Sequence, residues 1–205
     1  MSMLRYLCTE YDKRWGEKSG GILQSFDELQ QLMDELGSRH YKKMAEIGSY
    51  RGGTVWLYAM LFGGLNCKFT IIDIKIHPII YEVIKELKSR MAIEFEIIES
   101  PSHLANFGTV DFLHIDADHR YHMVKRDYET HYNKVNPGGV IVLHDTLLDE
   151  GWGRNKSGIP KFRKELEASG ANIKTFGGTI MLCDCFGPNK SNPDKRSIGI
   201  SMVYK

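Results

Sequence analysis

The regular alternation of short apolar runs with longer helical segments constrains this sequence more than any other feature. Five runs rich in Ile, Val, Leu and Phe are predicted to be strands, at 42–47, 68–73, 93–98, 110–116 and 140–145. Segments with helical periodicity precede, separate and follow them, at 25–36, 54–62, 79–91, 120–135 and 159–169. Parallel neighbours need a crossover connection, so strands separated by helices form right-handed βαβ units. The pattern predicts a doubly wound α/β domain with a mostly parallel sheet.

The end of the chain breaks this alternation. Three strand-like segments follow the last helix with no helix between them, at 171–178, 179–185 and 197–205. Mixed sheets often carry an antiparallel strand at one edge, so we expect an antiparallel C-terminal edge. A length of 205 residues fits one domain. We expect residues 1–205 to form it, with residues 1–24 as an N-terminal extension.

The charge and the amino-acid composition argue against two classes of binding partner, nucleic acid and membranes. The formal net charge is +1 and Lys and Arg are spread along the chain, so the basic stripe that binds a nucleic-acid backbone is missing. No apolar run approaches the roughly 20 residues of a membrane-spanning helix, and the N-terminus lacks the pattern of a secretory signal. Four cysteines form no CxxC pair. We expect a cytoplasmic protein with reduced thiols and with neither nucleic acid nor membrane as a partner.

The turn after the first strand is rich in glycine, and acidic residues end the strands around it. Sheets of this class bind ligands beyond the carboxyl ends of their strands. Glycines at 48, 52 and 53 have the spacing G-x-x-x-G-G, which differs from the G-x-G-x-x-G of dinucleotide-binding folds. Glu46 is placed to accept from an ammonium group, and Asp73 from the hydroxyls of a ribose. A purely structural turn is the alternative for the glycines taken alone.

Three segments together carry a resemblance to a known family. EIGSYRGGT, IIDI and HIDADHRYHMVKRDYETHYNKVNPGGVIVLHD resemble class I S-adenosylmethionine-dependent methyltransferases over about residues 20 to 170. The nearer match is the group that contains catechol O-methyltransferase-like, macrolide-sugar O-methyltransferase-like and cephalosporin-hydroxylase-like proteins. The resemblance implies a Rossmann-like methyltransferase fold with a seven-stranded sheet, S-adenosylmethionine as the cofactor, and a hydroxylated small molecule (a sugar, natural product or catechol-like compound) as the methyl acceptor.

The resemblance also implies a set of cofactor-binding residues. Ser102 matches the position that contacts adenine, although Ser100 and Pro101 replace the glycine and acid that the family usually has before it. Asp73 matches the ribose-binding acid. The full cofactor set is Glu46, Gly48, Ser49, Tyr50, Gly52, Gly53, Thr54, Asp73, Ile74, Ser102 and Asp116.

Transfer of a methyl group to a hydroxyl oxygen requires removal of the hydroxyl proton. A general base can take it, or a divalent cation can lower the hydroxyl pKa. Asp116 and Asp145 end adjacent strands, where they can share a cation such as Mg²⁺, and Asp116 matches a metal ligand of the resembling enzymes. His144 replaces the acid found in them, and it either favours Mn²⁺, Fe²⁺ or Zn²⁺ or takes over the function of the metal. His119 matches the general base, so His119 and Asp116 are the expected catalytic residues.

Several alternatives accompany this interpretation. A cofactor-binding accessory protein or a hydroxylase-like protein of the same fold is the main rival function. Asp145 is alternatively a cap of the loop that follows it, and His114 a hydrogen-bonded core histidine. The loop after Asp145 carries Trp152 and Arg154 and is predicted to form a lid over the cleft. The N-terminal segment either adds a wall to the cleft or makes a subunit contact in a homo-oligomer.

Overall fold

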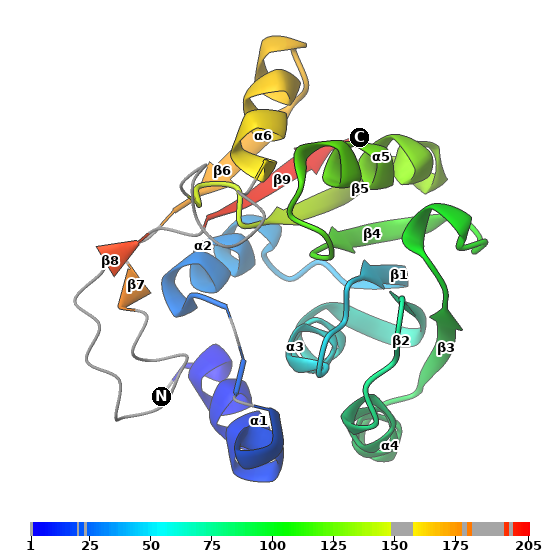
Figure 1. The fold of residues 1–205 in the computed structure, drawn as a ribbon. Coiled ribbons are helices and arrows are strands. Elements are labelled where there is room, and N and C mark those ends of the chain that lie inside the picture. The colour runs from blue at the N-terminus through cyan, green and yellow to red at the C-terminus, as the bar shows by residue number, and fades with distance from the viewer. Residues whose placement is uncertain are drawn as a thin grey trace.

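A seven-stranded mixed sheet with helices on both faces forms the core of the computed structural model (Figure 1). The structure describes residues 2–19, 21–22, 24–148, 158–177, 180–181, 195–196 and 199–205. The strands of the sheet are β1 (Tyr41–Ile47), β2 (Gly63–Asp73), β3 (Ile93–Glu99), β4 (Val110–Ile115), β5 (Val135–His144), β6 (Ile173–Phe176) and β9 (Ile200–Tyr204). Their order is β3-β2-β1-β4-β5-β9-β6. This arrangement confirms the predicted α/β class.

Within this sheet, antiparallel pairing occurs at the edge that the C-terminal strands form. β1 pairs in parallel with β2 and β4, and the β2–β3 and β4–β5 pairs are also parallel. β9 runs antiparallel to both β5 and β6. The predicted antiparallel edge is therefore confirmed, with β9 inserted between its two neighbours. The short strands β7 (Ile180–Met181) and β8 (Lys195–Arg196) form a separate antiparallel pair. Ile180 and Met181 are the described residues of the predicted strand 179–185.

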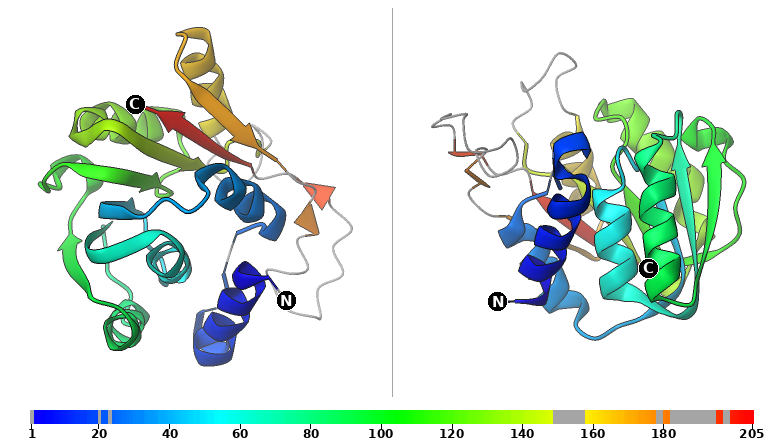
Figure 2. Two further views of the ribbon diagram at one scale, coloured as in Figure 1. Left: turned by 180° about the vertical axis from the view of Figure 1, so that it is seen from behind. Right: turned by 90° about the horizontal axis from the view of Figure 1, so that it is seen from below.

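Helices divide between the two faces of the sheet (Figures 1 and 2). One apolar core joins the sheet to α1 (Met3–Ser19), α2 (Phe26–Leu36), α3 (Gly53–Phe62) and α4 (Ile79–Arg90). The other core joins it to α5 (Tyr121–His131) and α6 (Ile159–Ala168). The 3₁₀ turns η1 (Ser102–Leu104) and η2 (Tyr132–Lys134) flank α5. Because both faces are covered, the central strands are apolar without alternation, and the run from Val140 to Leu143 is fully buried.

Residues Met3–Ser19 of the predicted N-terminal extension form α1, a helix that packs on α3 and was not predicted from the sequence. Trp15 of α1 makes an edge-on contact with Trp56, with ring centroids 5.5 Å apart. The indole of Trp56 donates a hydrogen bond to the carbonyl of Leu7 over 3.0 Å. α3 therefore lies between α1 and the sheet, which explains why nearly all of its side chains are buried. The right-hand view of Figure 2 shows α1 running beside α3.

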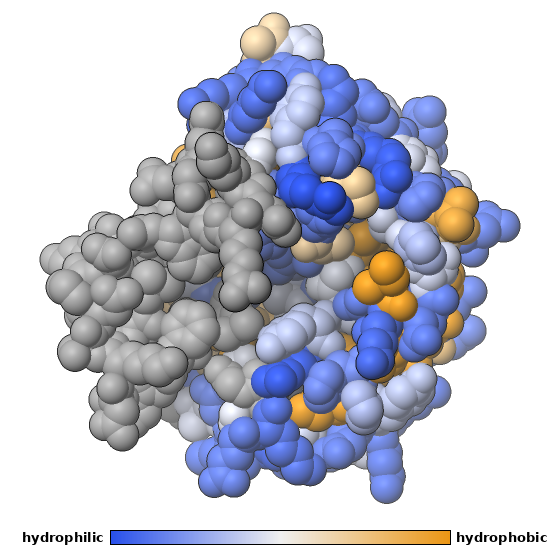
Figure 3. Space-filling model, in the orientation of Figure 1, coloured by the Kyte–Doolittle hydropathy of each residue, from blue (hydrophilic) through white to orange (hydrophobic). Residues whose placement is uncertain are grey.

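Most predicted helices agree with the structure within a few residues. Ser25 precedes α2 as expected of an N-cap, but its side chain makes no capping hydrogen bond. Among the described residues, no helix has the length and apolar content needed to cross a lipid bilayer. On the face shown in Figure 3, hydrophobic side chains are scattered among hydrophilic ones and do not form one broad patch.

Candidate active site

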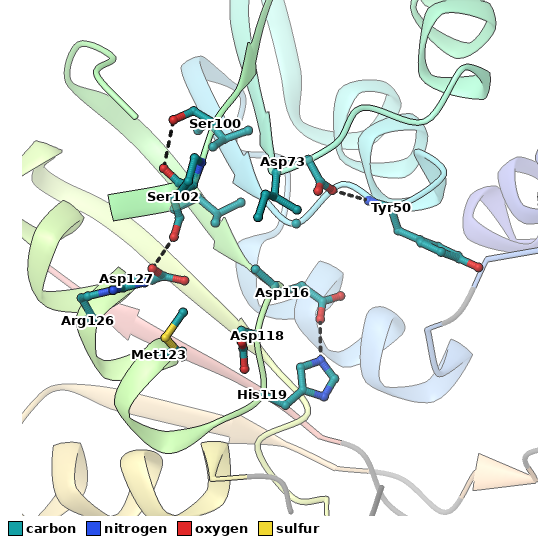
Figure 4. Close-up of a pocket in the computed structure, with 16 residues that line it drawn as sticks. Tyr50, Asp73, Ser100, Ser102, Asp116, Asp118, His119, Met123, Arg126 and Asp127 are labelled. Carbon is teal, nitrogen blue, oxygen red and sulfur yellow. Dashed lines mark hydrogen bonds and ion pairs between the residues drawn. The ribbon is translucent and has the colours of Figure 1, made fainter. Parts of the chain in front are cut away.

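A cavity of about 590 Å³ opens at the carboxyl ends of the central strands. Its walls come from the turns after β1, β2, β3 and β4 and from one face of α5. Figure 4 shows the labelled side chains of these segments around the cavity, with the ring of Tyr50 pointing away from Asp116. The predicted site residues that line it are Gly48, Tyr50, Asp73, Ile74, Ser102, Asp116 and His119. Parallel strands thus bring the glycine turn and the acidic strand end into one hollow, as expected for this class of sheet.

Gly48 allows the turn after β1 to lie directly against the end of β4. Its φ angle is 89°, in the left-handed region that glycine tolerates best. A Cβ atom at this position would lie 2.0 Å from the backbone oxygen of Asp116. The backbone N–H of Asp116 also donates to the carbonyl of Ile47 over 2.8 Å. This close contact fixes the distance between the glycine turn and the acid at the end of β4.

Asp73 anchors the same turn from the end of β2. Its Oδ2 accepts hydrogen bonds from the backbone N–H groups of Ser49, at 3.0 Å, and Tyr50, at 3.1 Å. The Ser49 hydroxyl donates to the same oxygen over 3.3 Å. Its Oδ1 accepts a bond from the backbone N–H of Lys75 at 3.3 Å. A carboxylate has about four lone-pair directions, so the Oδ1 side keeps the capacity to accept from a ligand hydroxyl.

Glu46 lies on the other side of β1 and does not line the cavity. It is fully buried, and its Oε1 accepts a hydrogen bond from the hydroxyl of Thr54. The same oxygen lies 2.9 Å from Nδ1 of His114, so this histidine is a hydrogen-bonded core residue. Ser49, Gly52, Gly53 and Thr54 also lie outside the cavity wall. The structure therefore divides the predicted cofactor set into wall residues and residues that hold the turn in place.

The far end of the cavity combines η1 with α5. The hydroxyl of Ser102 donates to Asp127, and the backbone oxygen of Ser102 lies 2.9 Å from Nε2 of His131. Burial raises the pKa of Asp127, against the effect of the Ser102 hydrogen bond. Met123 and Arg126 also line the cavity, although neither was predicted from the sequence as a site residue. Their spacing with Asp127 on the helix after β4 was the signal, since residues three and four apart share one helix face.

Two imidazoles and two carboxylates meet at the ends of β4 and β5. His119 lies between the acids, with Nε2 3.7 Å from Asp116 Oδ1 and Nδ1 3.2 Å from Asp145 Oδ2. Nδ1 of His144 lies 3.3 Å from Asp116 Oδ2 and 3.4 Å from Asp145 Oδ1. Asp116, His144 and Asp145 each offer one ligand atom within 4.8 Å of the others. The three predicted metal ligands and the predicted base therefore come together, and we name these four residues the acid–histidine cluster.

Burial and mutual charge displace the pKa values in this cluster. Burial would raise the pKa of Asp116, but the charge of His144 and contacts with both histidines hold it well below its usual range. The pKa of His119 is raised, chiefly by its contact with Asp116. Burial lowers this pKa, whereas the negative charge of Asp145 raises it further. Burial lowers the pKa of His144, yet the charges of Asp145 and Asp116 outweigh this and raise it to about 10. The pKa of Asp145 is raised, chiefly by burial.

Gln24 approaches this cluster from the N-terminal side, a contact that the sequence analysis missed. Its Nε2 donates to Asp116 Oδ2 over 3.4 Å. The contact joins residues far apart in the sequence, and no motif marks Gln24. Trp152 and Arg154, the predicted lid residues, lie outside the described residues.

Comparisons with known proteins point to one family. Residues 45–146 match a family model described as a methyltransferase domain. A stretch of 43 residues is 46% identical to an uncharacterized protein of Sinorhizobium fredii. That stretch is 21% of this chain and only 5% of that protein, so it carries no information on the activity of the whole chain.

Solved structures of methyltransferases share the fold. The O-methyltransferase TomG from Streptomyces achromogenes, in complex with S-adenosylmethionine, has a TM-score of 0.61 at 14% identity, covering 100% of this chain and 90% of that one. A putative caffeoyl-CoA O-methyltransferase from Staphylococcus aureus has a TM-score of 0.59 at 15% identity, covering 100% and 93%. An O-methyltransferase from Bacillus cereus, in complex with S-adenosylhomocysteine, has a TM-score of 0.54 at 15% identity, covering 99% of this chain and 100% of that one. At these identities the likeness establishes the fold.

Proposed function

This chain carries a methyltransferase domain, and we propose that it transfers the methyl group of S-adenosylmethionine to a hydroxyl oxygen of a small molecule. The observation that carries the proposal is the shared cavity. Asp73, which anchors the glycine turn, and the pair Asp116 and His119 line the same hollow. One cavity therefore combines features suited to a nucleoside with groups suited to proton removal.

The residues present fit the cofactor. The free side of Asp73 suits the hydroxyls of a ribose, and the apolar side chains of Ile72, Ile74 and Met123 line the cavity where a flat adenine ring would need apolar contact. Ser102 and Asp127 lie at the same end and offer polar contacts. When bound, S-adenosylmethionine supplies an activated methyl group on a sulfonium ion.

His119 is the proposed proton acceptor. Its imidazole lies between Asp116 and Asp145, whose negative charges stabilise the imidazolium that forms when it takes a proton. Its side chain is 38% exposed and lines the cavity, so an acceptor hydroxyl can reach it. Because methyl transfer mainly requires alignment and a deprotonated oxygen, a positioned base provides much of what the protein must add.

A divalent cation is the second part of the proposal. Asp116, His144 and Asp145 would hold it, and the cation would lower the pKa of the acceptor hydroxyl. The nitrogen of His144 favours Mn²⁺, Fe²⁺ or Zn²⁺ over Mg²⁺, which prefers oxygen ligands. The alternative is that His144 itself supplies the positive charge between the two carboxylates.

Binding of S-adenosylhomocysteine, measured by calorimetry, tests the cofactor assignment. We expect micromolar or tighter binding, followed by transfer of an isotopically labelled methyl group to members of a panel of sugars, catechols and hydroxylated natural products. No binding at high micromolar concentrations would refute the proposal. Binding without transfer to any acceptor would favour the accessory-protein alternative.

A further inference from the structure

Ile22, which lies between α1 and α2, is held in place by contacts with α1 and with the glycine turn. The carboxylate of Asp12 accepts a hydrogen bond from the backbone of Ile22. Ile22 packs so closely on Gly53 that a Cβ atom there would lie 3.2 Å from Ile22 Cγ1. The hydroxyl of Tyr11 donates to the carbonyl of Arg51 over 2.7 Å, which joins α1 to the glycine turn. These contacts fix Ile22, two residues before Gln24.

The side-chain amide of Gln24 is buried, and among the described residues only its nitrogen has a hydrogen-bond partner. Its residue is 7% exposed, and Nε2 makes a long contact of 3.4 Å with Asp116 Oδ2. Oε1 is buried and has no hydrogen-bond partner among the described residues. A half-turn of the terminal amide exchanges the two atoms, so the oxygen can occupy the side that now faces Asp116. After that half-turn the oxygen faces the cluster, and buried polar atoms are rarely left without a partner, so we look for a ligand of this oxygen in the cluster.

A cation in the cluster would satisfy that oxygen. The carboxylates of Asp116 and Asp145 and the imidazole of His144 offer three ligand atoms within 4.8 Å of one another. An amide oxygen is a common neutral ligand of divalent cations, and a cation repels the amide N–H groups while it attracts the oxygen. Nδ1 of His144 faces both carboxylates, at 3.3 Å from Asp116 Oδ2 and 3.4 Å from Asp145 Oδ1, so it is the nitrogen placed to share a cation with them.

We propose that Gln24 supplies its amide oxygen as a fourth protein ligand to a divalent cation held by Asp116, His144 and Asp145. This inference rests on the cation part of the proposed function. It gives the N-terminal extension a role in the reaction centre, because cation binding links the α1–α2 connection to the ends of β4 and β5. Three oxygens and one nitrogen form a donor set that suits Mn²⁺.

The test is titration of Mn²⁺ in wild type and three variants, followed by the electron paramagnetic resonance signal of free Mn²⁺. Gln24→Leu keeps the approximate shape of the side chain and removes its oxygen, and we expect Mn²⁺ affinity to fall by about tenfold or more. Gln24→Glu keeps an oxygen at this position, so we expect its Mn²⁺ affinity to equal or exceed that of wild type. The matched control is Gln30→Leu on α2, where Gln30 donates to Asp34 on an exposed surface. The Mn²⁺ affinity of this variant should equal that of wild type.

A second measurement separates ligation from packing. Hydrogen–deuterium exchange of the peptide that contains Gln24 should slow on addition of Mn²⁺ to wild type and to Gln30→Leu, but not to Gln24→Leu. Equal Mn²⁺ affinity in wild type and Gln24→Leu would overturn the inference, as would the absence of Mn²⁺ binding in wild type. Binding of S-adenosylhomocysteine is measured in the same samples: if it persists while Mn²⁺ does not bind, the cation inference fails and the methyltransferase proposal stands.

Discussion

The negative charges at the β2 end and at the β4 end of the cavity are balanced by different groups. At the β2 end, Asp73 accepts hydrogen bonds from the backbone N–H groups around it, so backbone dipoles balance its charge. At the β4 end, Asp116 and His119 line the cavity and contact His144 and Asp145, which do not line it. The pKa values of all four groups are displaced. Displaced pKa values and incompletely paired buried atoms are typical of reaction centres. The comparison indicates a preformed binding end and a reactive end whose charges are arranged for a ligand and a proton.

Replacement of His119 tests the reactive end and should have the largest effect. We expect His119→Ala to reduce turnover by about 10²–10⁴-fold, the range for loss of a general base. Affinity for S-adenosylhomocysteine should stay within about twofold, because the glycine turn and Asp73 do not depend on His119. Steady-state kinetics and calorimetry measure the two quantities.

His122→Ala is the matched control for this prediction. His122 lies three residues later, is exposed, and does not line the cavity. Its loss should leave turnover unchanged. Wild-type turnover in His119→Ala would remove His119 from the mechanism and weaken the contrast between the two ends.

Replacement of Asp73 tests the binding end and should have a smaller, different effect. Asp73→Asn removes the charge that accepts from Ser49 and Tyr50, and hydrogen bonds to charged groups contribute about 1.5–3 kcal/mol. We therefore expect S-adenosylhomocysteine to bind roughly 10- to 100-fold more weakly. Turnover at saturating S-adenosylmethionine should change little, because the base is untouched.

Asp27→Asn, on the exposed surface of α2, controls for the loss of a carboxylate. It should leave both constants at their wild-type values. If Asp73→Asn instead lowers turnover with unchanged cofactor affinity, the division of the cavity into a binding end and a reactive end is wrong.

The sequence predicted the sheet and the position of the site because both depend on local patterns and one topological rule. Helical and strand periodicity are visible within single segments, and parallel strands that neighbour one another end at one edge. That rule was sufficient to bring Gly48, Asp73 and Asp116 to one cavity. The rule does not say which face of a strand a side chain takes. Glu46 is one residue before the end of β1, and side-chain alternation turns it toward α3, away from the cavity.

What the sequence did not predict depends on contacts between distant segments. α1 has its buried residues Leu4, Leu7, Tyr11 and Trp15 on a narrow stripe within a strongly charged segment, so its periodicity is weak. The position of Gln24 beside Asp116 follows only after α1 has packed on α3. Such a contact has no signature in a single sequence, because it requires the docked positions of both segments.

The smallest expected effect concerns stability at the far end of the cavity, where His131 is fully buried beside Phe107. Burial lowers the pKa of His131 below its ordinary 6.5, and the positive charge of Lys134 lowers it further. The hydrogen bond to the backbone of Ser102 raises this pKa but does not cancel the effect of burial. The folded state therefore binds fewer protons at this group than the unfolded state, so its contribution to stability is present above about pH 6.5 and is lost as the pH falls through the folded-state pKa. His131→Gln keeps a donor for Ser102 but cannot be protonated. We expect the free energy of unfolding, measured with urea at a series of pH values, to fall less steeply below pH 6.5 in His131→Gln than in wild type. Parallel curves would show that protonation of His131 does not limit the stability of the far end of the cavity.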